Sequence, residues 1–330
     1  MKVQRITLED IAALAGVTKM TVSRYLRTPE KVKPETAERI ASVIEEVGYQ
    51  PDADNPAISS NVAPRIGVLV PSFNNQIFSD VLAGIESVTT AHGYQTLVVN
   101  YDYDSQREEE QIATVLALNV KALLLTESVH TLRAEKYLKA SKIPIAEVMG
   151  LSDNADRINV GFDNYRAGLD MTNMLLASGK KQIIYFGSMS DIRDEQRYAG
   201  YCRAMEDAGL TIGRIAPNKV SSVSIGTGMM TLARQMYKEM DAILCTNDDL
   251  AVGVLQECIA SGIAVPQEMA IAGFHGLEIG QVVSPRLASV LTPRFEMGKV
   301  ATEILIKKIK GLPTIEKVDL HYRLSMGETI

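Results

Sequence analysis

The sequence predicts an α/β fold, with doubly wound parallel sheets in two tandem halves behind a small all-α N-terminal domain. From Arg65 onward, short apolar runs alternate with amphipathic stretches, which is the rhythm of successive βα units. The apolar runs are continuous rather than alternating, as expected for parallel strands that are buried on both faces. Before residue 52 the periodicity is helical. A chain of 330 residues is long enough for two or three domains.

The first two helices are predicted in the run L-E-D-I-A-A-L-A-G-V-T-K-M-T-V-S-R-Y-L, from Leu8 to Leu26. Helical spacing of apolar residues stops at Gly16, as is typical of a helix C-terminus. Thr18 is a natural N-cap for a second helix, on which Val22 and Leu26 share one face. Two short helices joined by a tight glycine turn form a helix-turn-helix. In that motif the N-terminal residues of the second helix enter the DNA major groove.

The remaining faces of the second helix suit contact with DNA bases. Lys19 and Arg24 can reach guanine O6 and N7, and Met20 can touch a thymine methyl group. The alternative from spacing alone is an ordinary helical hairpin with a solvated basic face. The charge distribution favours the first interpretation. Residues 1–33 hold seven Lys or Arg and three acids, a local charge of +4, so the net charge of −6 leaves −10 on the rest.

A third helix is predicted from Pro34 to Val47. Its apolar stripe can close a three-helix core with residues of the first two helices, namely Ile11, Leu14 and Val22. We therefore assign residues 1–51 to the helix-turn-helix domain. Residues 52–64 are small, polar and punctuated by proline, and they are predicted to form a linker.

Residues 65–330 are predicted to hold eight strands, at 66–70, 95–100, 122–126, 143–148, 159–162, 182–186, 242–246 and 269–274. Amphipathic stretches between them include 80–91, 105–118, 165–177 and 248–261. Open α/β sheets bind ligands beyond the carboxyl ends of their strands. Polar side chains that could bind a ligand lie at those ends. One more such residue is expected at the start of the helix after the sixth strand. The candidates are Ser72, Asn74, Glu127, Asp163, Asn247 and His275, with Arg197 at the helix. Each could instead be a loop cap or turn residue.

The sequence gives little support for a catalytic function. The four histidines are not spaced as metal pairs, and the nucleophile elbow, the P-loop and the dinucleotide-binding glycine motif are absent from the sequence. We expect no cofactor. Met229 and Met230 are expected in the core, and either Asp248 or Asp249 is expected to cap a helix. Three cysteines without a C-x-x-C pair are expected to be free thiols. The sequence shows neither a signal peptide nor a membrane-length apolar run, so we expect a cytoplasmic protein.

The run V-T-K-M-T-V-S-R-Y-L resembles the DNA-binding signature of the lactose-repressor family, closest to the gluconate and idonate regulator branch. Other motifs that carry the resemblance are F-D-N at 162–164, T-N-D-D at 246–249 and I-A-G-F-H-G at 271–276. The resemblance covers nearly the whole chain. It implies a DNA-reading set of Thr18, Lys19, Met20, Thr21, Ser23, Arg24 and Ile58. Ile58 stands where family members insert a hinge leucine into the minor groove, but the usual Ala-Arg before it is missing. A plain flexible tether is the alternative.

The resemblance also implies a body like a periplasmic sugar-binding protein, with three crossings between two lobes. The crossings are expected near 162–164, near 291–293 and in the last few residues. Lobe 1 would then comprise about 65–162 and 293–321, and lobe 2 about 163–292 and 322–330. Because the sequence ends without a leucine heptad tail, we expect a homodimer rather than a tetramer. Its interface is expected on the first lobe, through the helix that carries Phe78, Val81, Leu82 and Ile85.

The resemblance implies a ligand-controlled transcription regulator, and we expect its effector to be a small sugar acid. Relatives that bind neutral sugars or purines carry an aspartate where this chain has His275. The exchange removes a negative charge and supplies a donor that can become cationic. Arg197 stands where family members hold ligand oxygens, and its planar fork matches a carboxylate. The alternatives are a solute-binding protein for a sugar transporter, or a sugar kinase or dehydrogenase.

Overall fold

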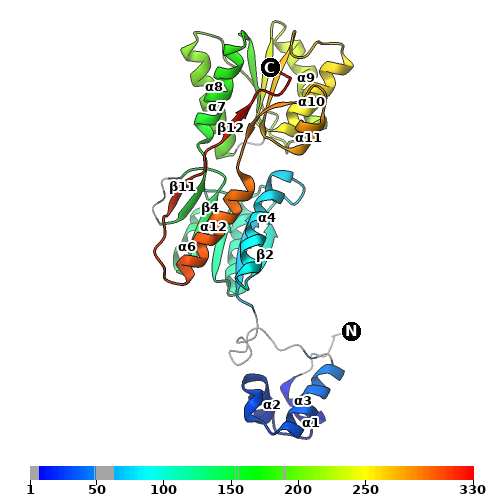
Figure 1. Cartoon of the computed structure of the whole chain (residues 1–330), viewed down its shortest axis with the longest axis vertical. Coiled ribbons are helices and arrows are strands. Elements are labelled where there is room, and N and C mark those ends of the chain that lie inside the picture. Colours follow the sequence, from blue (N-terminus) through cyan, green and yellow to red (C-terminus); the bar gives the residue numbers. More distant parts are fainter. Residues whose placement is uncertain (1–6, 48, 50–62, 153, 155, 189–190) are drawn as a thin grey trace. The chain divides into compact units, whose positions relative to one another are not determined.

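The computed structural model describes residues 7–47, 49, 63–152, 154, 156–188 and 191–330 (Figure 1). The chain divides into two compact units, and the boundary falls between Pro64 and Arg65. Ile58 and the rest of 50–62 lie outside the described residues, so the predicted hinge contact stays a prediction. Among the described residues, no helix is both long and apolar enough to cross a membrane.

The N-terminal unit is a three-helix domain built from α1 (Leu8–Leu14), α2 (Lys19–Arg27) and α3 (Pro34–Glu46), with a 3₁₀ turn at Pro29–Lys31. Thr7 and Asp10 form a capping box at the start of α1. One fully buried side chain from each helix, Ile11, Val22 and Ile40, makes the centre of the core. The predicted helix-turn-helix is therefore present, and the predicted N-cap Thr18 caps α2.

Leu14 was predicted in this core, and that prediction is wrong, because the side chain is 62% exposed. The buried residues of the first helix and its cap are Ile11, Ala12 and Ala15. At about 100° per residue, these three define a stripe from which Leu14 is rotated by roughly a quarter turn or more. Gly16 follows with φ +65°, which turns the chain before another turn of helix can form.

The larger unit contains two sheets. The sheet of lobe 1 has six strands in the order β11-β5-β4-β3-β1-β2, all parallel to their neighbours. These strands are β1 (Arg65–Val70), β2 (Gln95–Asn100), β3 (Ala122–Leu125), β4 (Ile145–Val148), β5 (Ile158–Gly161) and β11 (Lys317–Asp319). The sheet of lobe 2 has six strands in the order β12-β10-β9-β8-β6-β7, and only β12 runs antiparallel to its neighbour. These strands are β6 (Ile183–Phe186), β7 (Gly213–Ile215), β8 (Ala242–Cys245), β9 (Ala270–His275), β10 (Ala288–Leu291) and β12 (Arg323–Ser325).

Helices cover both faces of each sheet, which confirms the doubly wound fold class. In lobe 1, α4 (Gln76–Ala91) packs beside α12 (Arg294–Ile309) (Figure 1). On the other face, α5 (Ser105–Ala117) packs beside α6 (Leu132–Ser141). In lobe 2, α7 (Asn164–Ala177) packs on α8 (Ile192–Asp207), while α9 (Val223–Met236) packs on α10 (Asp248–Ala260), with α11 (Glu278–Val282) against α10. The chain passes between the sheets from β5 to α7, from β10 to α12 and from β11 to β12.

One apolar core runs through both lobes. It joins the face of lobe 1 under α4 and α12 to the face of lobe 2 under α7 and α8. Separate clusters lie under α5 and α6, and under α9 and α10. Met229 and Met230 belong to the last cluster, as predicted. The three cysteines are free, also as predicted.

Three helix pairs cross at glycines that bring the backbones together. Gly226 of α9 and Gly253 of α10 face each other's helix, and a Cβ built on Gly226 would lie 2.2 Å from the carbonyl oxygen of Leu250. The same arrangement joins α7 to α8 through Gly168 and Gly200. It also joins α4 to α12 through Gly84 and Gly298. These positions need glycine for close approach rather than for an unusual φ.

The sequence prediction found eight of the strands but missed β7, β10, β11 and β12. Three of these, β7, β11 and β12, have only three residues, lie at sheet edges and carry charged side chains, while Ser289 interrupts the apolar run of β10. Such segments lack the continuous apolar run that marks a central parallel strand.

Candidate functional site

The start of α2 presents the predicted DNA-reading side chains at the surface. Lys19, Met20 and Arg24 are exposed, while Val22 on the opposite side is fully buried. Met20 is 69% exposed, which is unusual for its type and leaves an apolar tip free to meet a base. Lys19 forms an ion pair with Glu9, and both side chains are more than half exposed. Such a pair contributes little to stability, so it can yield to a base or a phosphate.

The other predicted residues of α2 have local roles. The Thr18 hydroxyl accepts a hydrogen bond from the Thr21 backbone at 3.3 Å and lies 2.9 Å from the Thr21 hydroxyl. Ser23 accepts a hydrogen bond from Arg27 at 2.8 Å. These contacts fix the helix start and its exposed face. The assignment of these residues to DNA reading stays a prediction.

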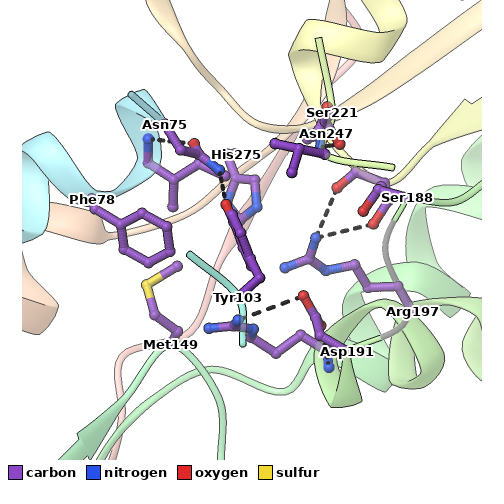
Figure 2. A pocket seen from close by; sticks show the side chains of 14 residues that line it. Asn75, Phe78, Tyr103, Met149, Ser188, Asp191, Arg197, Ser221, Asn247 and His275 are labelled. Carbon is purple, nitrogen blue, oxygen red and sulfur yellow. Dashed lines mark hydrogen bonds and ion pairs between the residues drawn. The ribbon is translucent and has the colours of Figure 1, made fainter. Parts of the chain in front are cut away.

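A cavity of about 50 Å³, partly open to solvent, lies between the carboxyl ends of the strands of the two lobes. Polar and apolar side chains converge on it, as is typical of small-ligand sites. Lobe 1 and lobe 2 both contribute side chains to its wall (Figure 2). The wall consists of Asn75, Ile77, Phe78, Tyr103, Met149, Ser188, Asp191, Arg193, Arg197, Val220, Ser221, Thr246, Asn247 and His275. We call this the inner cavity.

A second, more open hollow of about 380 Å³ adjoins the inner cavity. We call it the outer groove. Its wall consists of Tyr101, Tyr103, Ser105, Glu108, Glu127, Val129, Asp191, Ile192 and Glu195. Three of the predicted effector-binding residues, Arg197, Asn247 and His275, line the inner cavity, and Glu127 lines the outer groove.

Arg197 is held in place before any ligand arrives. It was expected to open a helix, but α8 begins at Ile192, so Arg197 lies in its second turn. Its Nε donates to Asn164 Oδ1 at 2.9 Å and its Nη1 donates to the Thr246 carbonyl at 2.7 Å. The guanidinium also lies 4.0 Å from the ring centroid of Phe274. Figure 2 shows the remaining nitrogen directed into the cavity. Burial lowers the pKa of Arg197, but a guanidinium stays charged at physiological pH.

His275 ends β9 with its ring on the cavity wall. Its φ of +98° is rare for a residue with a side chain, so the surrounding structure must hold it there. Its Nδ1 lies 3.2 Å from the Thr292 hydroxyl, and its carbonyl accepts a hydrogen bond from Arg294. Burial, with Arg197 and Arg294 nearby, lowers the pKa of His275 well below its usual value. The lowered pKa therefore favours a neutral imidazole at His275, whereas the sequence analysis expected a donor that can become cationic.

Asn247 both caps a helix and lines the inner cavity. Its Oδ1 accepts from the Leu250 backbone at 3.1 Å and so caps α10, and its Nδ2 donates to Ser221 at 2.6 Å. Neither neighbouring aspartate is the cap, contrary to the prediction. Asp248 is fully buried, where it accepts hydrogen bonds from Ser289 and the Leu277 backbone. Burial raises the pKa of Asp248 to about 7.

Three other predicted residues do not reach the wall of either hollow. Ser72 accepts a hydrogen bond from the Asn74 backbone at 3.1 Å, and Asn74 is exposed. Asp163 is exposed and caps α7 by accepting from the Arg166 backbone at 2.9 Å. In two cases the next residue in the chain points inward instead. Asn75 lines the inner cavity, and Asn164 holds Arg197.

Glu127 contacts a residue that the sequence analysis did not single out. Arg193, one helical turn before Arg197 on α8, reaches across from lobe 2 to lobe 1. It donates to the Thr126 carbonyl at 2.7 Å and to Glu127 Oε1 at 2.6 Å. Tyr101 donates to the same carboxylate oxygen at 3.1 Å. We call the Arg193–Glu127 pair the lobe clasp. The i, i+4 spacing of two arginines on one helix is the sequence signal that could have revealed Arg193.

Comparison with known proteins identifies the class that this fold and cavity define. Residues 63–323 match the family of periplasmic binding proteins and the sugar binding domain of the LacI family. Residues 7–52 match the bacterial regulatory proteins of the lacI family. The chain therefore belongs to the LacI family of DNA-binding transcription regulators, which confirms the resemblance seen in its motifs. The match at residues 7–52 favours a regulator over the two alternatives, a solute-binding protein for a sugar transporter and a sugar kinase or dehydrogenase.

The chain is similar over its whole length to two regulators of Escherichia coli K12. It is 46% identical over 332 residues to the HTH-type transcriptional regulator IdnR, with 100% of both chains covered. It is 45% identical over 331 residues to the regulator GntR, again with full coverage. Among solved structures, a LacI family regulator from Silicibacter pomeroyi superimposes with a TM-score of 0.88 at 29% identity, covering 98% of this chain and 99% of that one. The regulator GntR from Chromobacterium violaceum gives 0.78 at 34% identity, covering 80% and 98%.

Proposed function

We propose that this regulator represses genes for sugar-acid catabolism and that a small sugar acid, of the gluconate or idonate type, binds in the inner cavity. The observation that carries the proposal is Arg197, a buried guanidinium with two nitrogens fixed by protein and one facing the cavity. A charged fork fixed in this way favours a carboxylate over a neutral hydroxyl. Resemblance to the gluconate and idonate branch supports the same ligand class.

The rest of the wall suits the hydroxyl groups of such a ligand. Asn75, Ser188, Ser221 and Asn247 provide amides and hydroxyls that can both donate and accept hydrogen bonds. Neutral His275 adds a ring nitrogen rather than a charge. Phe78 and Met149 supply the apolar surface against which the carbon chain of the ligand can lie.

Control of DNA binding requires that the effector prefer one arrangement of the lobes. The inner cavity is lined from both lobes, so a ligand that contacts both walls favours the closed arrangement. The lobe clasp favours the same arrangement without ligand. We propose that closure changes how two copies of the N-terminal domain are presented to operator DNA, in the cytoplasm.

We propose a homodimer because a helix-turn-helix commonly reads one half of a two-fold operator. The four apolar residues that led us to expect the interface on α4 pack in the core of lobe 1. Phe78, Val81 and Ile85 of α4 are buried within lobe 1, and Leu82 is partly buried against the same core. The interface is therefore left unassigned. Analytical ultracentrifugation that shows only monomer at micromolar concentration would contradict the dimer.

The effector class is tested by calorimetry on the wild type and on Arg197→Lys. Lysine keeps the charge but cannot satisfy Asn164, Thr246 and a ligand together. We expect gluconate to bind the wild type more tightly than glucose or ribose, and we expect the substitution to weaken gluconate binding about tenfold or more. Tighter binding of the neutral sugars would exclude the proposed effector class. Selection of DNA from a random pool, with and without gluconate, tests the DNA-binding half independently.

A further inference from the structure

The inner cavity and the outer groove share two wall residues, Tyr103 and Asp191. Asp191 is fixed, because its carboxylate caps α8 by accepting from the backbones of Arg193 and Asp194 at 2.8 and 2.9 Å. Tyr103 is held less firmly. Its hydroxyl accepts a hydrogen bond from Asn75 Nδ2 at 3.1 Å, and the side chain stands in the middle of the view in Figure 2. Tyr103 is therefore the side chain whose removal would join the two hollows.

The backbone at Tyr103 adopts an uncommon conformation that sets the position of the ring. Asp102 and Tyr103, directly after β2, have φ values of +52° and +59°. Two consecutive non-glycine residues in the left-handed region cost free energy, and such strain persists where the surrounding structure imposes it. This turn brings the phenol ring inward between the lobes instead of letting the loop run outward.

We propose that Tyr103 limits the length of the effector. Its ring closes the inner cavity toward the outer groove, so the wild type accepts an acid of one sugar unit and excludes an acid that carries a glycosyl substituent. The proposal deepens the proposed function and rests on it for the acid at Arg197. The limit on length itself depends only on the position of Tyr103.

The two hollows differ in charge, which specifies the ligand that would span them. The inner cavity has Arg193, Arg197 and Asp191, whereas the outer groove has four carboxylates, Glu108, Glu127, Asp191 and Glu195. Glu127 is paired with Arg193 and Glu195 with Arg214, but their oxygens still offer hydrogen-bond acceptors. Carboxylates accept hydrogen bonds from sugar hydroxyls and repel a second acid. A ligand that spans both hollows would place its carboxylate inside and a neutral sugar outside. Lactobionate, which is gluconate with a galactosyl substituent, has this pattern.

The experiment compares Tyr103→Gly with Tyr103→Phe. Glycine removes the ring and suits the positive φ, so the fold should be retained. Phenylalanine keeps the ring and removes only the hydroxyl. Calorimetry would measure gluconate and lactobionate, and a second pair, glucose and lactose, would test length without the acid. We expect the wild type and Tyr103→Phe to prefer the shorter ligand of each pair. We expect Tyr103→Gly to raise the affinity for the longer one by about tenfold or more.

A folded Tyr103→Gly variant that still discriminates against the longer ligand as the wild type does would overturn the length limit. So would a wild type that binds lactobionate as tightly as gluconate. Weak binding of both acids with retained length discrimination between glucose and lactose would contradict the sugar-acid effector alone. Crystal structures of the two variants give a readout without ligand. The hollows should be continuous in Tyr103→Gly and separate in Tyr103→Phe, and separation in both would also overturn the proposal.

Discussion

At the scale of single residues, the inner cavity combines fixed charge with neutral polar groups. Of the two arginines on its wall, Arg193 is paired with Glu127, which leaves Arg197 as the cation for a ligand. Burial and the neighbouring arginines lower the pKa of His275 and so favour its neutral form. A carboxylate at this position would therefore meet one strong, immobile partner and several weaker hydrogen-bonding groups. Substitutions at His275 are therefore expected to act by adding a negative charge beside Arg197, not by removing a positive one.

We expect His275→Asp to weaken gluconate binding about tenfold or more, because the new carboxylate would pair with Arg197 and repel the ligand. His275→Asn is the matched control, since asparagine tolerates a positive φ and stays neutral. It should cost less affinity than the aspartate. Both affinities are measured by calorimetry, with the melting temperature as a check on folding. Equal losses in the two variants would show that charge at this position does not matter.

Residue-scale prediction from the sequence succeeded where a side chain both faces the cavity and ends a strand, as in Asn247 and His275. It placed Asn74 and Asp163 at the site, whereas their neighbours Asn75 and Asn164 face inward. Strand-end turns rotate successive side chains to different sides, and that rotation depends on backbone angles that residue type does not specify. The sequence analysis did not identify Tyr103 for the same reason, because its inward position depends on two consecutive positive φ values.

At the scale of elements, α2 separates a buried face from an exposed one, and Arg24 lies on the exposed face. We expect Arg24→Ala to weaken operator binding more than binding to random DNA, because base contacts give specificity while phosphate contacts position the protein. Arg39→Ala, an exposed arginine on α3, is the control within the same domain. Gel-shift titrations at one fixed salt concentration measure both DNAs. An equal loss on the two DNAs for Arg24→Ala would contradict a base-reading role.

The glycines at the helix crossings allow a controlled test of packing, because α9 carries one glycine at a crossing and another on its exposed face. Gly226 meets the backbone of α10, whereas Gly228 is exposed and has open space around the position of a Cβ. We expect Gly226→Ala to lower the free energy of unfolding by about 1–3 kcal/mol through overpacking. Gly228→Ala should raise it by roughly 0.5–1 kcal/mol, since alanine loses less backbone entropy in a helix. Urea titrations measure both, and a similar change in the two variants would show that the crossing tolerates a methyl group.

At the scale of the whole molecule, the order of βα units could be predicted from the sequence because long apolar runs mark central parallel strands. The strands that the C-terminal part of the chain adds to each sheet could not be predicted in the same way. β10 contains a serine in its apolar run, and β11 and β12 are three-residue edge strands that carry charges, so their pairing depends on the sheet already being present. The inter-lobe contact of Arg193 is also a product of the assembled fold. Its partners, Thr126 and Glu127, lie more than sixty residues earlier in the chain.

The lobe clasp predicts how a change outside the inner cavity alters the response to effector. Glu127→Gln keeps the shape of the side chain but removes the charge that Arg193 pairs with, so the closed arrangement loses part of its stabilisation. The apparent effector affinity falls in proportion to the closed population. We therefore expect a higher half-saturating effector concentration, with the same change in operator binding at saturation. Calorimetry and gel-shift titration measure these two quantities.

X-ray scattering without ligand distinguishes the clasp from a direct contact between Glu127 and the effector. If Glu127 acts through the clasp, the ligand-free Glu127→Gln variant should have a larger radius of gyration than the wild type, because more molecules are open. If Glu127 only bound the effector, the ligand-free scattering of the two proteins would be identical and the affinity alone would fall. Glu135→Gln is a control in lobe 1, because Glu135 forms an ion pair with Arg157 of the same lobe. It should leave both the scattering and the effector affinity unchanged, since this pair does not join the lobes.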